Sequence, residues 1–217
     1  MTMRAALSIA LVCAAAATAR AGSNELEAGS ELRALRSPSA GALTDNSLGG
    51  GHLAYARSLG ELAPGLELWI GGGLDFGSAE GTMFQTMTTS IDTFELLATA
   101  RVRYHIYDHV LATARVSAGS SRTSLDISDD SGTDMSDARW GAIGRGALGV
   151  ELASREHARW SAVFRVEAGY ARATAPALTL QPSTPDDGTL RLPMSDSSIG
   201  HLDLSGPFIA FSLASQF

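Results

Sequence analysis

The sequence predicts an all-β protein, an antiparallel up-and-down transmembrane β-barrel of about eight strands. Three observations lead to this prediction. Long stretches alternate between apolar and polar residues, the connections between them alternate between short and long, and the polar face carries charges of both signs. A period of two residues is the signal of a β-strand, and an alternating sheet with unequal ends is typical of a membrane barrel.

The alternation is clearest in the segment that begins at Thr93, TFELLATARVRYHI. Every second residue from Phe94 to Ile106 is apolar, whereas the other face includes Glu95 and Arg101. The same division recurs near residues 24–35, 66–76, 110–119, 140–152 and 160–170. These stretches exceed the usual strand of ~5 to 6 residues in a soluble sheet. We therefore expect them to cross a membrane.

The connections fall into two classes. Short breaks lie at residues 61–65, 107–109 and 154–158, and longer polar stretches lie at 37–48, 78–92, 126–137 and 174–203. Their alternation predicts tight turns at the periplasmic end and longer loops outside the cell.

In a membrane barrel the apolar face meets lipid, so the charged face points into the lumen. Buried charges are tolerated when they are paired and hydrogen-bonded, and both signs are available here. Glycines such as Gly71, Gly73, Gly141, Gly149 and Gly169 would leave room for long side chains in an interior that eight strands make narrow. The predicted lumen charge network comprises Glu27, Glu31, Arg33, Glu67, Asp75, Glu95, Arg101, Arg103, Arg115, Arg145, Glu151, Arg165 and Glu167.

The first 21 residues have the features of a secretory signal peptide. Arg4 precedes an apolar run, and Ala19 to Ala21 gives an A-x-A cleavage site, so residues 22–217 are expected to form the barrel domain. Removal of residues 1–21 would take away Cys13, which is the only cysteine, and would change the net charge from −7 to −9 through loss of Arg4 and Arg20. The acidic mature chain is not expected to bind nucleic acid.

The final strand carries a further resemblance. Ile209, Phe211, Leu213 and the terminal Phe217 alternate, and this segment resembles the C-terminal assembly signal of bacterial outer-membrane proteins, although Ser215 departs from the pattern. The segment from Asn24 to Phe217 resembles the small eight-stranded OmpA/OmpX-type barrels, without a signature that names a subfamily. The resemblance implies export to the outer membrane, contact with its lipid and lipopolysaccharide, and recognition by the barrel-assembly machinery. We expect a monomer.

Some small barrels are lipid A-modifying enzymes, so the histidines near the outer rim were considered as catalytic candidates. His201 precedes Asp203 and Ser205, and His52 precedes Ala54, so neither forms the His-x-Ser pair of the deacylases. A nucleophile needs its base within hydrogen-bond reach, which favours rim or lumen positions for both histidines. The sequence predicts no catalytic residue.

The acidic stretch 126–137 could bind calcium through its clustered carboxylates, but it lacks the spacing of a recognised calcium loop and its final bidentate Glu. A solvated acidic loop is the favoured interpretation, and no metal or other cofactor is predicted.

Several functions remain open at this stage. The leading hypothesis is a non-enzymatic barrel with a charge-paired closed lumen, which stabilises the outer membrane or makes surface contacts through loops whose ligand is unknown. The alternatives are a narrow porin-like channel, a lipid A-modifying enzyme and a soluble β-sandwich. A barrel would direct its aromatic residues toward lipid and its interfaces: Phe94, Tyr104, Trp140, Trp160, Tyr170, Phe211 and Phe217.

Overall fold

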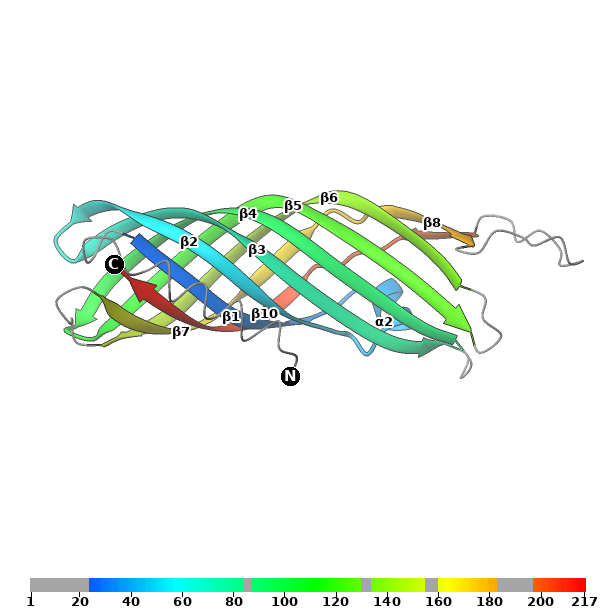
Figure 1. Cartoon of the computed structure of the whole chain (residues 1–217), viewed down its shortest axis with the longest axis horizontal. Coiled ribbons are helices and arrows are strands. Elements are labelled where there is room, and N and C mark those ends of the chain that lie inside the picture. The colour runs from blue at the N-terminus through cyan, green and yellow to red at the C-terminus, as the bar shows by residue number, and fades with distance from the viewer. Residues whose placement is uncertain (1–23, 84–86, 130–133, 155–159, 183–196) are drawn as a thin grey trace, which may run out of the picture.

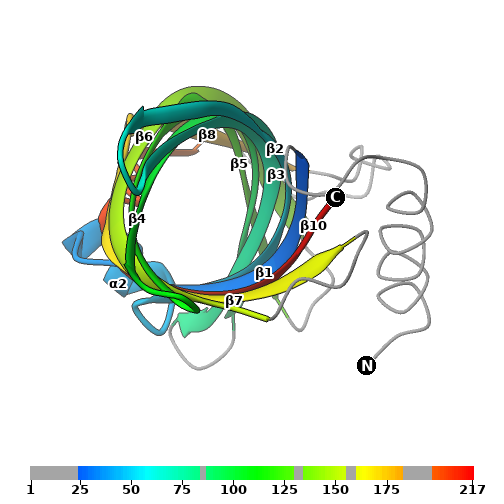
Figure 2. The same ribbon diagram turned by 90° about the vertical axis from the view of Figure 1, so that its left-hand side faces the viewer.

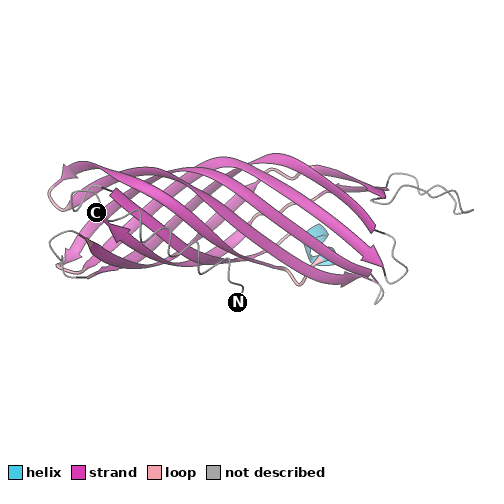
Figure 3. Cartoon of the chain, viewed as in Figure 1, coloured by secondary structure: helices cyan, strands magenta, loops and turns pink. Residues whose placement is uncertain are grey.

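The computed structural model describes residues 24–83, 87–129, 134–154, 160–182 and 197–217. Nearly all of them lie in strands, with one short helix (Figure 3). The elements are β1 (Asn24–Ala34), α2 (Pro38–Leu43), β2 (Ser47–Ala63), β3 (Leu66–Met83), β4 (Met87–Tyr107), β5 (Val110–Asp129), β6 (Asp134–Ala153), β7 (Ser161–Ala173), β8 (Ala177–Pro182), β9 (Ser197–His201) and β10 (Gly206–Gln216). Among the described residues, no helix is long and apolar enough to cross a membrane.

Eight of these strands close into a ring (Figures 1 and 2). Sequential strands pair antiparallel from β1 to β7, and β10 then pairs with both β7 and β1. The first and last strands are joined from Glu25 opposite Gln216 to Arg33 opposite Phe208. Closure pairs the backbone groups that an open sheet would leave at its edges, which a strand in hydrocarbon requires. The predicted barrel of about eight strands is confirmed.

The two ends of the barrel differ. At the left in Figure 1, tight turns join β2 to β3 and β4 to β5, and β10 ends there; we call this the turn end. Gly65 in the first turn has a φ of +74°, a conformation that glycine adopts without steric cost. The opposite end carries α2, β8 and β9, and we call it the loop end. The predicted turn at 154–158 lies outside the described residues, apart from Ser154.

The prediction for the long connections was wrong in an informative way. Stretches 78–92 and 126–137 were predicted to be loops, but β3, β4, β5 and β6 continue through most of them as paired strands. Stretch 37–48 contains α2, and 174–203 contains β8 and β9. The serines, threonines and aspartates of stretches 78–92 and 126–137 indicate that the outer face of the sheet meets water there. They do not indicate a loss of secondary structure.

The outer surface carries an apolar belt. Its exposed residues include Leu148 at 70% and Val116 at 63% of full exposure, and the aromatic Phe76, Tyr104, Trp140, Trp160, Tyr170 and Phe211. Beyond Trp140 and Phe76, toward the loop end, the outward positions become Ser78, Glu80, Asp92 and Asp126. An apolar band edged by aromatic residues is the surface of a barrel that spans a membrane.

Candidate functional site: a lumen in two parts

The lumen is the part of the molecule where charged and polar side chains converge, and it divides along the barrel axis. On β1 the inward residues from the turn end are Glu25, Glu27, Gly29, Glu31 and Arg33, and the chain then continues to the apolar Leu35. On β5 they run from Arg115 through hydroxyl residues to Leu125. The same strands therefore pass from a charged interior to an apolar one.

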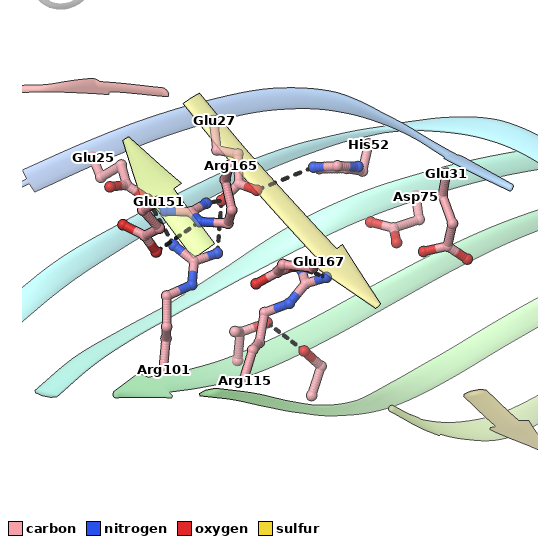
Figure 4. A network of polar contacts seen from close by, with 12 residues as sticks. Glu25, Glu27, Glu31, His52, Asp75, Arg101, Arg115, Glu151, Arg165 and Glu167 are labelled. Atoms are coloured by element: carbon pink, nitrogen blue, oxygen red, sulfur yellow. Dashed lines mark hydrogen bonds and ion pairs between the residues drawn. The ribbon is translucent and has the colours of Figure 1, made fainter. Parts of the chain in front are cut away.

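The first charge cluster lies nearest the turn end and comprises Glu25, Glu27, His52, Arg101, Arg103, Glu151 and Arg165. Figure 4 labels all of these residues except Arg103. Arg101 bridges Glu25 and Glu27, each at 2.7 Å. Arg165 reaches three carboxylates, at 3.0 Å from Glu25, 2.5 Å from Glu27 and 2.8 Å from Glu151. The cluster ties β1 to strands that are not its neighbours in the ring, because Arg101 belongs to β4 and Arg165 to β7.

Arg103 completes this cluster. Its guanidinium pairs with Glu25, lies 2.8 Å from Glu151 and stacks over the Trp69 ring at 4.3 Å from the ring centroid. A guanidinium above an aromatic face is an attractive arrangement. Trp69 is therefore a lumen residue, whereas the aromatic residues named in the previous section lie in the lipid-facing belt.

The second charge cluster lies nearer the loop end and comprises Glu31, Arg33, Asp75, Glu95 and Arg145. Arg145 is its centre, at 2.7 Å from Glu31 and 2.5 Å from Asp75, and it also pairs with Glu95. Arg33 lies 3.0 Å from Glu31 and 3.2 Å from Glu95. A separate pair joins Arg115 to Glu167 at 2.6 Å. Strands β1, β3, β4 and β6 are thus linked through a second layer of charges.

The structure places every residue of the predicted lumen list except Glu67 in an arginine–carboxylate pair. Glu67 is the least buried of them; it lies at the turn end, 3.4 Å from His105, and accepts a hydrogen bond from Trp69. Sequence reasoning left out Glu25, which is fully buried and pairs with three arginines. The alternation already placed Glu25 on the inward face, so the signal was present.

The lumen glycines have a more demanding role than providing space. A Cβ atom at Gly71 would lie 2.1 Å from the Tyr55 carbonyl oxygen, and one at Gly149 would lie 2.4 Å from the Val166 oxygen and 2.7 Å from the Glu167 side chain. The strong curvature of an eight-stranded ring brings neighbouring backbones close on its inner face. Glycine is required there by the backbone as well as by the charged side chains.

An apolar core fills the interior at the loop end, and we call it the apolar cap. Its central members include Ile91, Leu125 and Leu178, none of which is exposed. The complete set is Leu35, Ala40, Leu43, Leu48, Ala79, Ile91, Leu125, Leu178, Leu180, Leu202 and Leu204. Helix α2 contributes two of these residues and is joined to the sheet by the Thr89 hydroxyl, which donates to the Leu43 carbonyl. A cavity of about 10 Å³ lies between Leu48 and the second charge cluster, roughly enough for one water molecule.

The two candidate histidines lie in different surroundings, one in the lumen and one at the loop end. His52 is buried with a ring nitrogen 3.2 Å from Glu27, and His201 is exposed with Nδ1 3.0 Å from the Ala175 carbonyl. Within the part of the chain that the structure describes, no histidine ring contacts a serine hydroxyl. In the acidic stretch, Asp126 lies on the outer face of β5, and residues 130–133 lie outside the described residues.

Asp137 in that stretch has a structural role beyond the apolar belt. It accepts hydrogen bonds from the backbone N–H of Thr179 at 2.9 Å and from Arg139 at 3.0 Å, and so joins β6 to β8. Burial raises the pKa of Asp137, but the donors from Thr179, Arg139 and Ala138 outweigh it and lower the pKa below its ordinary value.

The residues of the predicted assembly signal divide in the structure. Ile209, Phe211 and Leu213 are exposed on the outer face of β10. Phe217 was predicted to face lipid with them, but only 8% of it is exposed. Its backbone exchanges two hydrogen bonds of 3.0 Å with Asn24 at the start of β1. The terminal residue therefore takes part in closing the ring.

The ring and its apolar belt define the chain as a small eight-stranded transmembrane β-barrel, and the up-and-down architecture expected from the sequence is confirmed. No protein-family model matches the chain, and no curated protein matches it. The chain is similar to the crystal structure of Ail, the attachment invasion locus protein of Yersinia pestis, at 13% identity and a TM-score of 0.46, over 90% of this chain and 97% of Ail. A structure of Ail in complex with the heparin analogue sucrose octasulfate gives 13% identity and a TM-score of 0.44 over the same shares.

Proposed function

We propose that the protein is a non-enzymatic, non-conducting barrel of the bacterial outer membrane that holds a rigid β-structured surface outside the cell for contact with other molecules. The turn end then faces the periplasm and the loop end faces outward. The observation that carries this proposal is the continuation of β3 to β6 beyond the apolar belt around the apolar cap.

Two layers of side chains in the interior support the proposal of a closed lumen. Two clusters of ion pairs occupy the interior within the belt, and the apolar cap fills the interior beyond it. An ion entering from outside would first have to cross packed leucine side chains and would then meet arginines already paired with carboxylates. Both steps oppose conduction, because burial of an unpaired charge is costly.

The surface-contact role is favoured over membrane stabilisation alone by the length and character of the projection. From Phe94 to Met87, β4 continues for about 23 Å of strand at the usual rise per residue. Its outward side chains there and on β3 and β5 are polar, including Glu80, Ser90, Asp92 and Asp126. A barrel that only stabilised a bilayer would not need an ordered polar sheet outside it.

Conductance tests the closed lumen. We expect purified protein in a planar bilayer to show no steady current, with rare small openings at most. Large, stable, ion-selective steps would favour the narrow porin-like channel instead. Incubation with lipopolysaccharide should give no deacylated product; its appearance would favour the lipid A-modifying enzyme.

Cell experiments test the location and the surface role. The protein should fractionate with the outer membrane and migrate differently on a gel before and after boiling. In a deletion strain, wild-type protein and an Asp92→Arg/Asp126→Arg variant should restore the permeability barrier equally, while the variant alone loses adherence to surfaces or cells. Equal adherence of both proteins would contradict the surface-contact role.

A further inference from the structure

The lipid-facing surface carries a groove across four neighbouring strands, which we call the β4–β7 groove. It measures about 580 Å³, and its apolar lining consists of Ala100, Val102, Ala114, Val116, Gly146, Leu148, Ala168 and Tyr170. The strand register sets these residues in two rows, with Val116 opposite both Ala100 and Gly146, and Leu148 opposite both Ala114 and Ala168. Small residues form the floor, and Val116, Leu148 and Tyr170 rise beside it.

Two arginines lie beyond this groove toward the loop end. Arg172 follows Tyr170 on the same face of β7, and Arg122 lies opposite Trp140. Both are exposed, and neither forms an ion pair with any residue that the structure describes. The arginines of the two charge clusters, in contrast, are all paired with carboxylates. Arg122 and Arg172 thus present free cationic groups at the outer border of the belt.

The spacing of these arginines suits a ligand with two anionic groups. They are separated by two strand spacings across the sheet and four residues along it, which places their Cα atoms roughly 16 Å apart. Ala142 and Gly144 lie on the outer face between them and leave that surface low. If the two side chains extended toward each other over the outer surface, the distance between their guanidinium groups would approach the distance between the two phosphates of a diphosphorylated disaccharide.

A second groove on the same belt has a different arrangement of charges beyond it. This β1–β3 groove measures about 360 Å³, and Leu26, Tyr55, Gly72 and Leu74 are among its lining residues. The exposed charged residues beyond it, toward the loop end, include Arg36 after β1, Asp45 before β2 and Glu80 on β3. A headgroup with two phosphates would find a single arginine there, whereas two arginines lie beside the β4–β7 groove.

We propose that the β4–β7 groove, with Arg122 and Arg172, is a binding site for a diphosphorylated outer-leaflet glycolipid, the lipid A part of lipopolysaccharide. One acyl chain of the lipid lies along the small residues from Gly146 toward Ala114. The two phosphates of its headgroup pair with the two arginines. This inference rests on the proposed outer-membrane location of the protein. It assigns one face of the barrel to the lipid and leaves the β1–β3 groove to ordinary acyl chains.

Native mass spectrometry of the refolded protein in detergent tests this site without depending on cellular location. Added diphosphorylated lipid A should give a one-to-one complex. Arg122→Gln/Arg172→Gln should weaken it about tenfold or more through loss of two charge-assisted contacts. Gly146→Leu, where an added Cβ would meet no atom within 4 Å, should weaken it by filling the groove.

Matched controls fall on the other groove. Ala28→Leu, opposite Leu53, and Arg36→Gln, at an exposed arginine beyond the β1–β3 groove, should leave lipid A binding unchanged. Heat-shifted gel mobility must show that every variant is folded. Equal binding of lipid A by all variants would overturn the proposal, and so would equal affinity for phosphatidylglycerol. It would also be overturned if Gly146→Leu disrupted a protein dimer while lipid A binding persisted. A protein that binds lipid A at this site but does not fractionate with the outer membrane would refute the proposed location only.

Discussion

The lumen within the apolar belt and the interior beyond it are enclosed by the same strands but stabilised by opposite means. Within the belt, Arg145 and its carboxylate partners lie inside while apolar residues face lipid. Beyond it, Leu125 and Ile91 lie inside while Asp126 and Asp92 face water. The difference teaches that a strand's inward face takes its character from what surrounds the barrel: lipid outside permits a polar interior, and water outside requires an apolar one.

The largest expected effect comes from removing the centre of the second charge cluster. Arg145→Ala leaves Glu31, Asp75 and Glu95 buried with too few cations, which should lower the free energy of unfolding by about 3 to 5 kcal/mol. Glu95→Ala should act similarly. Ser128→Ala, in the stretch 126–137, should change the free energy of unfolding by less than about 0.5 kcal/mol. Urea titration of the refolded barrel, followed by tryptophan fluorescence, measures all three.

The isolated pair provides a control for the charge argument. Arg115→Met combined with Glu167→Leu removes both ions of one pair, so it should destabilise the barrel less than either single substitution. If the double variant were as unstable as the sum of the single variants, packing and not charge pairing would hold this part of the lumen.

The next effect concerns the apolar cap. Leu125→Ala removes a side chain with no exposure and should cost about 2 to 5 kcal/mol, with little dependence on salt. If the whole barrel unfolds in one transition, the loss appears in the same titration; if the cap opens separately, proteolysis of the loop end detects it first. A change below about 0.5 kcal/mol would mean that the cap contributes nothing to a packed core.

Deletion of Phe217 tests whether the part of the barrel that contains the two charge clusters depends on this residue. One buried aromatic side chain accounts for about 1 to 3 kcal/mol, which is too little to unfold a closed barrel. We therefore expect a modest loss of stability for protein refolded in detergent and a much larger loss of assembled protein in cells. Losses of equal size in both assays would argue against recognition of this residue by the assembly machinery.

The smallest effect should come from Asp137, which joins β8 to the sheet. Because its pKa is lowered in the folded protein, its carboxylate stabilises this contact above the unfolded pKa, and the contribution is lost as pH falls through the lower folded value. Proteolysis near β8 should therefore increase below about pH 4. Asp137→Asn should be less protected from proteolysis near β8 at neutral pH and should lose this pH dependence. A variant with the same pH profile of proteolysis as the wild type would contradict the role of Asp137 in joining β8 to the sheet.

The sequence predicted the membrane-spanning part of the fold well because its alternation is uninterrupted. On β4, Glu95 and Arg101 lie on one face and Phe94 and Val102 on the other. In a bilayer this strand can therefore be oriented only with the charged face toward the lumen and the apolar face toward lipid. The outer part was misassigned because its alternation has the opposite phase. Leu125 and Ile127 in β5, between serines and aspartates, and Leu178 and Leu180 in β8 carried a strand signal that the polar composition obscured.

The partners within the lumen could not be predicted from the sequence. Alternation shows that Arg165 and Glu25 face inward, but their 3.0 Å separation depends on barrel closure and strand stagger. The same holds for Trp69 and Arg103. These contacts join residues from β1, β3, β4 and β7, which no local pattern brings together.

The pairing of β1 with β10 also has a consequence for the time course of folding. Gln216 donates a hydrogen bond to Glu25, a contact that spans 191 residues of sequence. The ring cannot close until the last strand has been synthesised and delivered, and contacts this remote form slowly because the intervening chain must first be ordered. Until then the arginines that pair with Glu25 lack that partner and remain hydrated. Closure and charge pairing should consequently occur together as one late, rate-limiting event, which is the step that an assembly catalyst would have to accelerate.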